Sequence, residues 1–467
     1  MTRGLYSLLT LTLAVLLASC TVGPRYQRPA VDVPETYRGP DHPSAGLTTE
    51  PLGDARWWTV FQDPQLQELI RIALLQNYDV RIAATRVLEA QAQLGITRAD
   101  QLPSVSGGAN ITSQRNPQVA NRFPAYETNT GELNLSVIWN LDFWGKYRRA
   151  TEAARANLLG SEWGRRAVLD TVISNVASAY FQLRALDLQL KISQHTLASR
   201  QDSLHLTQVL AQNGSASDLD VRQAEQLVYT ASETIPDLER AIQQQENLIS
   251  ILVGKNPGPI ARGRGITEQP NPLSVPSGLP SALLERRPDI REAEENLIAA
   301  NAEIGVAKAA YYPDISLTGT GGFQSDALTR LFTGPAGLWN AGASLTQPLF
   351  QGGRLRSNLK LSQAQQQQEL LTYQRVVQEA FREVSDSLIG YQKGREFREQ
   401  QGLLTTAAQG AARLSDIRYR GGTASYLEVL TNETNYFSAE LNLAQAELNE
   451  RLALVQLYQA LGGGWQE

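Results

Sequence analysis

The chain has 467 residues, of which 19% are charged, and it contains one methionine and one cysteine. Few of the soft side chains that usually fill globular cores are present, so long polar helices are expected in place of several globular domains. The net charge of −5 excludes nucleic acid as a partner, because no basic cluster is dense enough to neutralise a run of phosphates.

The N-terminal residues predict an export signal. Residues 5–19 are apolar, follow a single Arg3, and are too few to span a bilayer as a helix. Residues 17–20, which end in Cys20, resemble the signal of bacterial lipoproteins, in which the cysteine is lipidated and becomes the new N-terminus. Thr21 in place of an aspartate is similar to lipoproteins sent on to the outer membrane. We expect a signal peptide at 1–19 and lipid on Cys20, with an ordinary secretory signal as the alternative.

The rest of the chain is a duplication. Residues 81–95 correspond to 291–305 with an offset of 210, since Gly95 matches Gly305. The offset then becomes 208, so that residues 214–217 match 422–425 and residues 253–254 match 461–462. This pattern predicts an extended segment at 20–60, a first repeat at 61–254, a proline-rich linker at 255–287 and a second repeat at 288–464.

Each repeat is expected to carry two amphipathic strands, at about 104–113 and 132–143 in the first and about 314–323 and 338–349 in the second. In the clearest strand, one face carries Leu133, Leu135, Val137, Trp139, Leu141 and Phe143, and polar residues alternate with them except at Ile138. This alternation is typical of a membrane barrel wall, and the alternative is a half-buried sheet of a soluble sandwich. Four strands cannot close a barrel, and lipid excludes open edges, so several chains must share one barrel.

Helices account for the remaining length. Shorter helices are expected at about 64–101 and 288–311, where Pro103 and Pro313 stop them. The long stretches at 146–211 and 354–419 contain no proline and would each extend about 100 Å. Apolar residues at alternating steps of three and four predict a coiled coil, with a plain bundle core as the alternative; they are Leu169, Val172, Val176, Ala179, Leu183, Leu186 and Leu190. Trp57, Trp58, Phe61 and Trp465 are expected to pack the flanking segments onto these helices.

Several motifs together resemble the TolC-like outer membrane factors, in the lipoprotein branch that serves resistance-nodulation-division efflux pumps. They are Tyr26-Gln27-Arg28-Pro29, Trp57-Trp58 with Phe61 and Asp63-Pro64, the run 286–291, and the ending 461–465. The resemblance implies an α+β membrane protein: a homotrimer with a twelve-stranded barrel in the outer membrane and a periplasmic barrel of coiled-coil helices. It also implies a periplasmic adaptor and an inner-membrane pump as partners, and no cofactor beyond the lipid on Cys20.

The turns between long helices are predicted at Gly214 and at Gly421-Gly422. Ser217 with Asp220, and Ser425 with Glu428, have the spacing of a capping box, which needs a hydroxyl at the helix start and a carboxylate three residues later. The resemblance adds a gate at this end, in which Asp220, Glu428 and Tyr419 match gate positions. The arginine of the family pattern falls at Ala424 here, so that Arg418 or Arg420 would have to supply its link. A cap and a gate both remain open for these acids.

Other classes of protein fit less well. An enzyme is not expected, because the histidines are His42, His195 and His205 and neither a phosphate-binding loop nor metal-ligand spacing occurs. A periplasmic adaptor also combines a lipid anchor with helical hairpins, but it lacks the duplicated strands. A type I secretion channel would keep the same fold and export proteins. The predicted function is the passive outer-membrane exit duct of an efflux system for drugs, organic solutes or metal ions.

Overall fold

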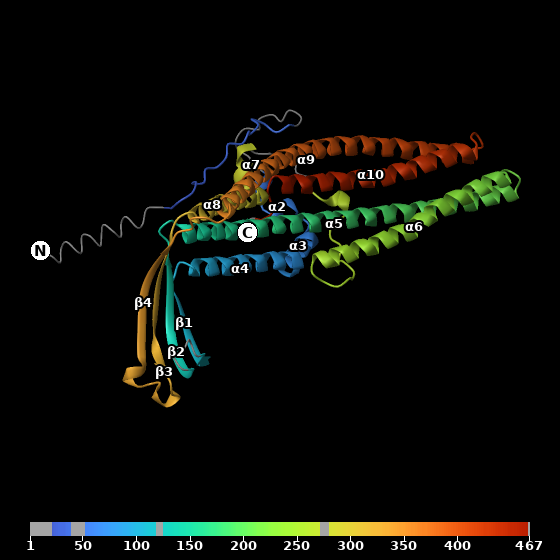
Figure 1. Cartoon of the computed structure of the whole chain (residues 1–467). Helices are drawn as coiled ribbons and strands as arrows, with labels where there is room; N and C mark the ends of the chain where they lie inside the picture. Colours follow the sequence, from blue (N-terminus) through green and yellow to red (C-terminus); the bar gives the residue numbers. More distant parts are fainter. Residues whose placement is uncertain (1–20, 39–51, 118–124, 271–279, 466–467) are drawn as a thin grey trace. The chain divides into compact units, whose positions relative to one another are not determined.

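The computed structural model describes residues 21–38, 52–117, 125–270 and 280–465, so Cys20 lies outside the described residues. The chain forms two compact units, whose elements are labelled in Figure 1. The strand unit comprises Met1–Ala30, Arg86–Glu162 and Glu292–Gln374. The helix unit comprises Val31–Thr85, Trp163–Arg291 and Arg375–Glu467.

The strand unit contains one antiparallel sheet of four strands in the order β1-β2-β3-β4 (Figure 1). The strands are β1 Ser104–Asn116, β2 Tyr126–Leu141, β3 Asp314–Ser325 and β4 Gly337–Thr346. β2 begins six residues before the predicted start, because its first residues are polar on both faces and show no alternation, although they pair with β1. β4 ends before the predicted residue 349, since Pro348 has no N–H to donate.

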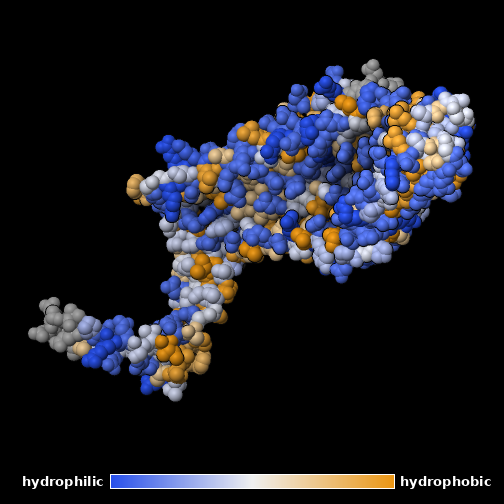
Figure 2. Space-filling view, turned by 90° about the vertical axis from the view of Figure 1, so that its right-hand side faces the viewer, coloured by the Kyte–Doolittle hydropathy of each residue, from blue (hydrophilic) through white to orange (hydrophobic). Residues whose placement is uncertain are grey.

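The strand register places residues of one kind in rows across the sheet. Val105 faces Val137, which faces Gly319, which faces Ala341. The next row is polar and consists of Ser106, Ser136, Thr320 and Asn340, with 3.5 Å between the hydroxyl oxygens of Ser136 and Thr320. Successive side chains of a strand point to opposite faces, so one face of the sheet is apolar or small and the other is polar. Figure 2 shows hydrophobic side chains exposed on the surface of the sheet.

Four long helices follow the strands. They are α5 Lys146–Gln212, α6 Asp218–Leu252, α9 Arg354–Arg420 and α10 Tyr426–Ala460, and they form the hairpins α5–α6 and α9–α10 (Figure 1). The predicted apolar stripe of α5 is buried at its centre, at Val172, Val176, Ala179 and Leu183. Among the described residues, no helix combines the length and the run of apolar side chains that a membrane span requires.

The shorter helices differ from the prediction at one position. Residues 64–101 were expected to form one helix, but α3 Pro64–Gln76 and α4 Tyr78–Ala99 are separate. Asn77 makes the break: its Oδ1 accepts hydrogen bonds from the N–H groups of Asp79 and Val80, and its Nδ2 donates to the carbonyl of Leu252 over 2.8 Å. The side chain therefore caps α4 and ties it to the end of α6. In the second repeat α8 spans Pro288–Ala309, and the short helix α7, Pro280–Arg286, lies at the end of the predicted linker.

Trp57 and Phe61 are buried as predicted, whereas Trp58 is half-buried and lies edge-on against Trp57. Trp57, in the short helix α2 Trp57–Val60, and Phe61 are buried, and Phe61 makes edge contacts with Phe181 of α5 and Tyr458 of α10. Trp465 lies edge-on against Trp163, with 5.8 Å between ring centroids. These contacts hold both flanking segments of the helix unit against its long helices.

Asp63 secures the linker in the helix unit. This fully buried carboxylate caps α3 and accepts hydrogen bonds from the hydroxyl of Tyr180, the N–H of Arg264 and the Nε2 of Gln269. A carboxylate with this many donors is a satisfied structural anchor. The described part of the linker also contains the 3₁₀ turn Ile266–Glu268, so it is less extended than its prolines predict.

Candidate functional site

The tip of each long-helix hairpin is a tight turn at a glycine. Gly214 has φ of +74°, and its N–H donates to the carbonyl of Ala211 while the N–H of Ser215 donates to that of Leu210. Gly422 has φ of +68° and the same two hydrogen bonds one repeat later. This is the Schellman ending of a helix, which needs the left-handed conformation that glycine adopts without strain. The structure thus has a turn at each of the two predicted positions, and Gly421, which follows the last residue of α9, has no positive φ.

The first tip has the predicted capping box. The N–H of Asp220 donates to Ser217 Oγ over 3.2 Å, and the N–H of Ser217 donates to Asp220 Oδ2 over 2.9 Å. These two bonds satisfy N–H groups at the start of α6 that have no partner within the helix. The Asp220 side chain is thereby hydrogen-bonded to the first residues of its own helix.

The second tip does not have the predicted capping box. Ser425 occupies the cap position of α10, but its side chain makes no capping hydrogen bond. Glu428 accepts instead from Arg418 Nη1 of α9 over 2.6 Å. The repeat explains the difference, because Leu210 stands where Arg418 stands in the second half. A guanidinium within reach competes for the carboxylate, since it adds the attraction of an opposite charge to the hydrogen bond.

The other two predicted gate residues, Arg420 and Tyr419, contact residues close to them. Arg420 Nε donates to Asp416 one turn earlier in α9 over 3.0 Å, so this arginine does not cross the turn. Tyr419 packs edge-on against Tyr426, with 5.2 Å between ring centroids, and both belong to an apolar cluster with Ala224 and Leu204. Burial raises the pKa of Tyr419. Arg418 and Glu428 thus pair at one tip, while Asp220 caps the other hairpin and its charge adds to the rise in the pKa of Tyr419.

Two charged residues of the long helices, Arg200 and Glu433, are not marked by any motif in the sequence. Arg200 of α5 is 2% exposed, donates to the carbonyl of Leu227 over 2.8 Å, and has its guanidinium carbon 4.9 Å from the ring centroid of Phe437. Burial raises the pKa of Glu433, and the charge of Arg200 opposes that shift. Both residues lie within long polar helices, where no motif distinguishes a buried charge from an exposed one.

The segment after Cys20 is seated in the strand unit. The N–H of Val22 donates to the carbonyl of Trp144, just after β2, and Arg28 forms a 3.0 Å ion pair with Glu294. Gly23 has φ of +117°, and a Cβ there would lie 2.6 Å from the Cα of Gly305. The segment therefore needs glycine at this position, and residue 21 begins close to the end of a predicted membrane strand.

The described residues contain no group of three histidine, cysteine or acidic side chains that could hold a metal ion. His195 and His205 are both exposed on α5. The site residues that the structure assembles are ion pairs, caps and turns, which can hold a tip in one conformation but offer no arrangement for acid–base or nucleophilic chemistry.

Comparison with known proteins agrees with this geometry. A family model described as outer membrane efflux protein matches the chain twice, over residues 69–255 and 279–463. The probable efflux pump outer membrane protein TtgC of Pseudomonas putida is 35% identical over 478 residues, covering 100% of this chain and 97% of the relative. The cation efflux system protein CusC of Escherichia coli is 34% identical over 460 residues, covering 98% and 99%.

The fold is similar to solved channels as well. The open state of the MtrE outer membrane channel of Neisseria gonorrhoeae superposes with a TM-score of 0.87 at 31% identity, covering 96% of this chain and 99% of that chain. The double match of one family model confirms the duplication, and the structural likeness confirms the predicted fold class. The chain therefore belongs to the outer membrane efflux protein family, as a passive channel component and not an enzyme.

Proposed function

We propose that three copies of this chain form one duct across the outer membrane and the periplasm. The observation that carries the proposal is the sheet: β1 and β4 are its two edges, and each pairs with a single neighbour within the described chain. Unpaired backbone groups in lipid cost several kcal/mol each, by order of magnitude, so these edges need partners. Pairing β1 of one copy with β4 of the next leaves no open edge, and three copies give the twelve strands that the resemblance implies.

The duct would receive its solutes from a periplasmic adaptor and an inner-membrane resistance-nodulation-division pump. Relatives of this chain are named for antibiotic, toluene and cation efflux. We infer that this chain also exports small toxic solutes, either organic compounds or metal ions. The pump would determine which solutes enter the duct. Lipid on Cys20 would add a second attachment to the outer membrane beside the barrel.

The gate would lie at the helical tips. Arg418 pairs with Glu428 across the turn of one hairpin, and Tyr419 packs in the apolar cluster with Tyr426 and Ala224. Three copies of Asp220 around one mouth would attract cations, because fixed charges of one sign focus the field in a narrow opening, and Glu428 would add to this field once its pair with Arg418 separates. Binding of the adaptor and pump would separate these contacts without consuming a nucleotide.

Native mass spectrometry of the purified full-length protein, followed by conductance in planar bilayers, tests the proposal. We expect a mass of three chains and discrete channels that prefer cations. A monomer that forms no channels would reject the duct, and a trimer without conductance would restrict the chain to a structural link. Loss of resistance to solvents or metal ions in a deletion strain, restored by the gene, would support the proposed cargo class, whereas loss of protein secretion alone would favour type I export.

A further inference from the structure

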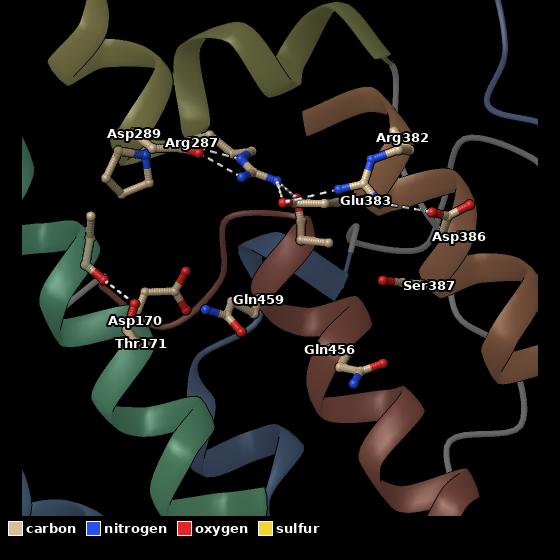
Figure 3. Close-up of a pocket in the computed structure, with 13 residues that line it drawn as sticks. Asp170, Thr171, Arg287, Asp289, Arg382, Glu383, Asp386, Ser387, Gln456 and Gln459 are labelled. Carbon is tan, nitrogen blue, oxygen red and sulfur yellow. Dashed lines mark hydrogen bonds and ion pairs between the residues drawn. The ribbon is translucent and has the colours of Figure 1, made fainter. Parts of the chain in front are cut away.

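The helix unit contains a cavity of about 350 Å³ among α5, α9, α10 and the start of α8 (Figure 3). Its charged side chains come from three of these elements. α5 supplies Asp170, the junction of α7 with α8 supplies Arg287 and Asp289, and α9 supplies Arg382, Glu383 and Asp386. The amides of Gln456 and Gln459 on α10 complete the lining.

Both arginines of the cavity are already paired. Arg287 donates to both carboxylate oxygens of Asp289 over 3.0 and 2.6 Å, and it forms a 2.8 Å ion pair with Glu383. Arg382 donates to Asp386 over 3.2 Å. The two guanidinium charges are thus balanced within the wall of the cavity, and an anionic ligand would have to displace an existing partner.

Asp170 is the exception among the charged residues. It is 6% exposed, its Oδ1 is buried without a hydrogen-bond partner, and no ion pair joins it to another described residue. In Figure 3 its carboxylate points from α5 towards the side chain of Gln459. A buried carboxylate without a partner is costly, so a group that supplies donors at this position would be favoured.

We propose that this cavity binds a small organic cation with a primary ammonium group, for which Asp170 is the counter-ion. An ammonium group has three donors and no acceptor, which complements a buried carboxylate oxygen without a donor. The volume suits a small ligand. A divalent metal ion fits less well, because the described residues contain no group of three side chains that could hold one.

Binding should be linked to a proton. Burial raises the pKa of Asp170 well above its ordinary value, with Arg287 opposing the shift and Asp289 adding to it. The other charged or titratable groups around the cavity are Glu383, Arg382 and Asp386 from α9 and Tyr458 from α10. A bound ammonium favours the ionised form of Asp170, so the protein releases a proton wherever that group was protonated.

Calorimetry of the full-length protein in detergent with butylammonium tests the site, and butanol serves as the uncharged probe. Asp170→Asn keeps the shape and removes the charge, while Asp386→Asn removes an exposed, paired carboxylate of the same cavity. We expect butylammonium, and not butanol, to bind the wild type. Affinity should fall at least about tenfold in Asp170→Asn and less than about threefold in Asp386→Asn.

Titration in two buffers with different ionisation heats provides a second readout on the wild type alone. A buffer-dependent heat indicates proton release and supports Asp170 as the counter-ion. The proposal is overturned if butylammonium does not bind at about 10 mM, if butanol binds equally well, or if Asp170→Asn binds like the wild type. Asp170 lies 42 residues before the end of α5 at Gln212, about 60 Å along the helix, so the conductance of Asp170→Asn should match the wild type and show that the duct is intact.

Discussion

Arg418 and Glu428 form an ion pair of 2.6 Å across the turn between α9 and α10. The matching carboxylate of the first repeat, Asp220, instead caps its own helix. The carboxylates at equivalent positions of the two repeats thus have different partners, because only the second repeat has an arginine within reach. The proposed gate is therefore expected to depend on the second hairpin more than on the first.

Removing this ion pair should loosen the tip. Arg418→Ala is expected to raise single-channel conductance, whereas thermal stability should change little, since exposed pairs contribute about 0–1 kcal/mol. The matched control is Arg420→Ala, because Arg420 pairs with Asp416 within α9 and does not cross the turn. Equal conductance of both variants and the wild type would place the gate elsewhere.

The two cap serines should differ when they are replaced. Ser217→Ala removes a capping box and should destabilise the start of α6 by about 1 kcal/mol, whereas Ser425→Ala should have a smaller effect because its side chain makes no cap bond. Amide hydrogen exchange near residues 218–222 and 426–430 measures this local stability. Equal acceleration at both sites would contradict the distinction between the two tips.

The sheet register predicts opposite effects for neighbouring residues of β2. Val137 lies in the apolar row, so Val137→Arg should destabilise the barrel by about 2–4 kcal/mol if it faces lipid near the middle of the membrane. Ser136 lies in the polar row, and Ser136→Arg should assemble and mainly alter conductance. Heat-resistant oligomers on gels report assembly. Failure of Ser136→Arg alone would mean that the two faces are inverted.

Mass spectrometry of the mature protein tests lipidation. We expect the chain to begin at Cys20 with attached acyl chains, each of which contributes about 0.8 kcal/mol per buried CH₂ to membrane binding. Cys20→Ser should yield a chain without lipid. An unmodified N-terminus beyond residue 20 in the wild type would exclude the anchor without excluding the barrel, whose lipid-facing strands are separate from it.

We expect Glu433 of α10 to make the free energy of unfolding depend on pH. Burial raises the pKa of its carboxyl, Asp416 adds to this shift, and Arg200 and Arg420 oppose it. The folded state therefore holds this proton more tightly than the unfolded state, and the free energy of unfolding falls as the pH rises from the ordinary value of 4.5 through the raised value. Other carboxylates change over the same range, so the comparison is with Glu433→Gln, in which this fall should be smaller.

Melting temperatures of the wild type and Glu433→Gln measured across this range give the difference. Glu239→Gln, at an exposed position of α6, is the control and should follow the wild type. Parallel curves for the wild type and Glu433→Gln would show that Glu433 does not contribute to the pH dependence.

Local patterns in the sequence determined the strands, the long helices, the turns and the duplication. Strand alternation, proline positions and glycine turns depend on neighbouring residues, so they can be read along the chain. The break at Asn77 was missed because its side chain is held partly by Leu252, which is far away in the sequence. The polar start of β2 was missed because its evidence is pairing with β1 and not alternation.

Only the tertiary structure decided which charges meet. The spacing of Ser425 and Glu428 is the same as that of Ser217 and Asp220, yet Arg418 takes the carboxylate of Glu428 in one repeat only. Likewise, no motif marks Asp170 or Arg200, whose burial results from the packing of helices far apart in the sequence. Local spacing shows which groups could form a hydrogen bond. Which donor binds a given carboxylate, and which charged side chains lose contact with water, depends on how the helices pack against one another.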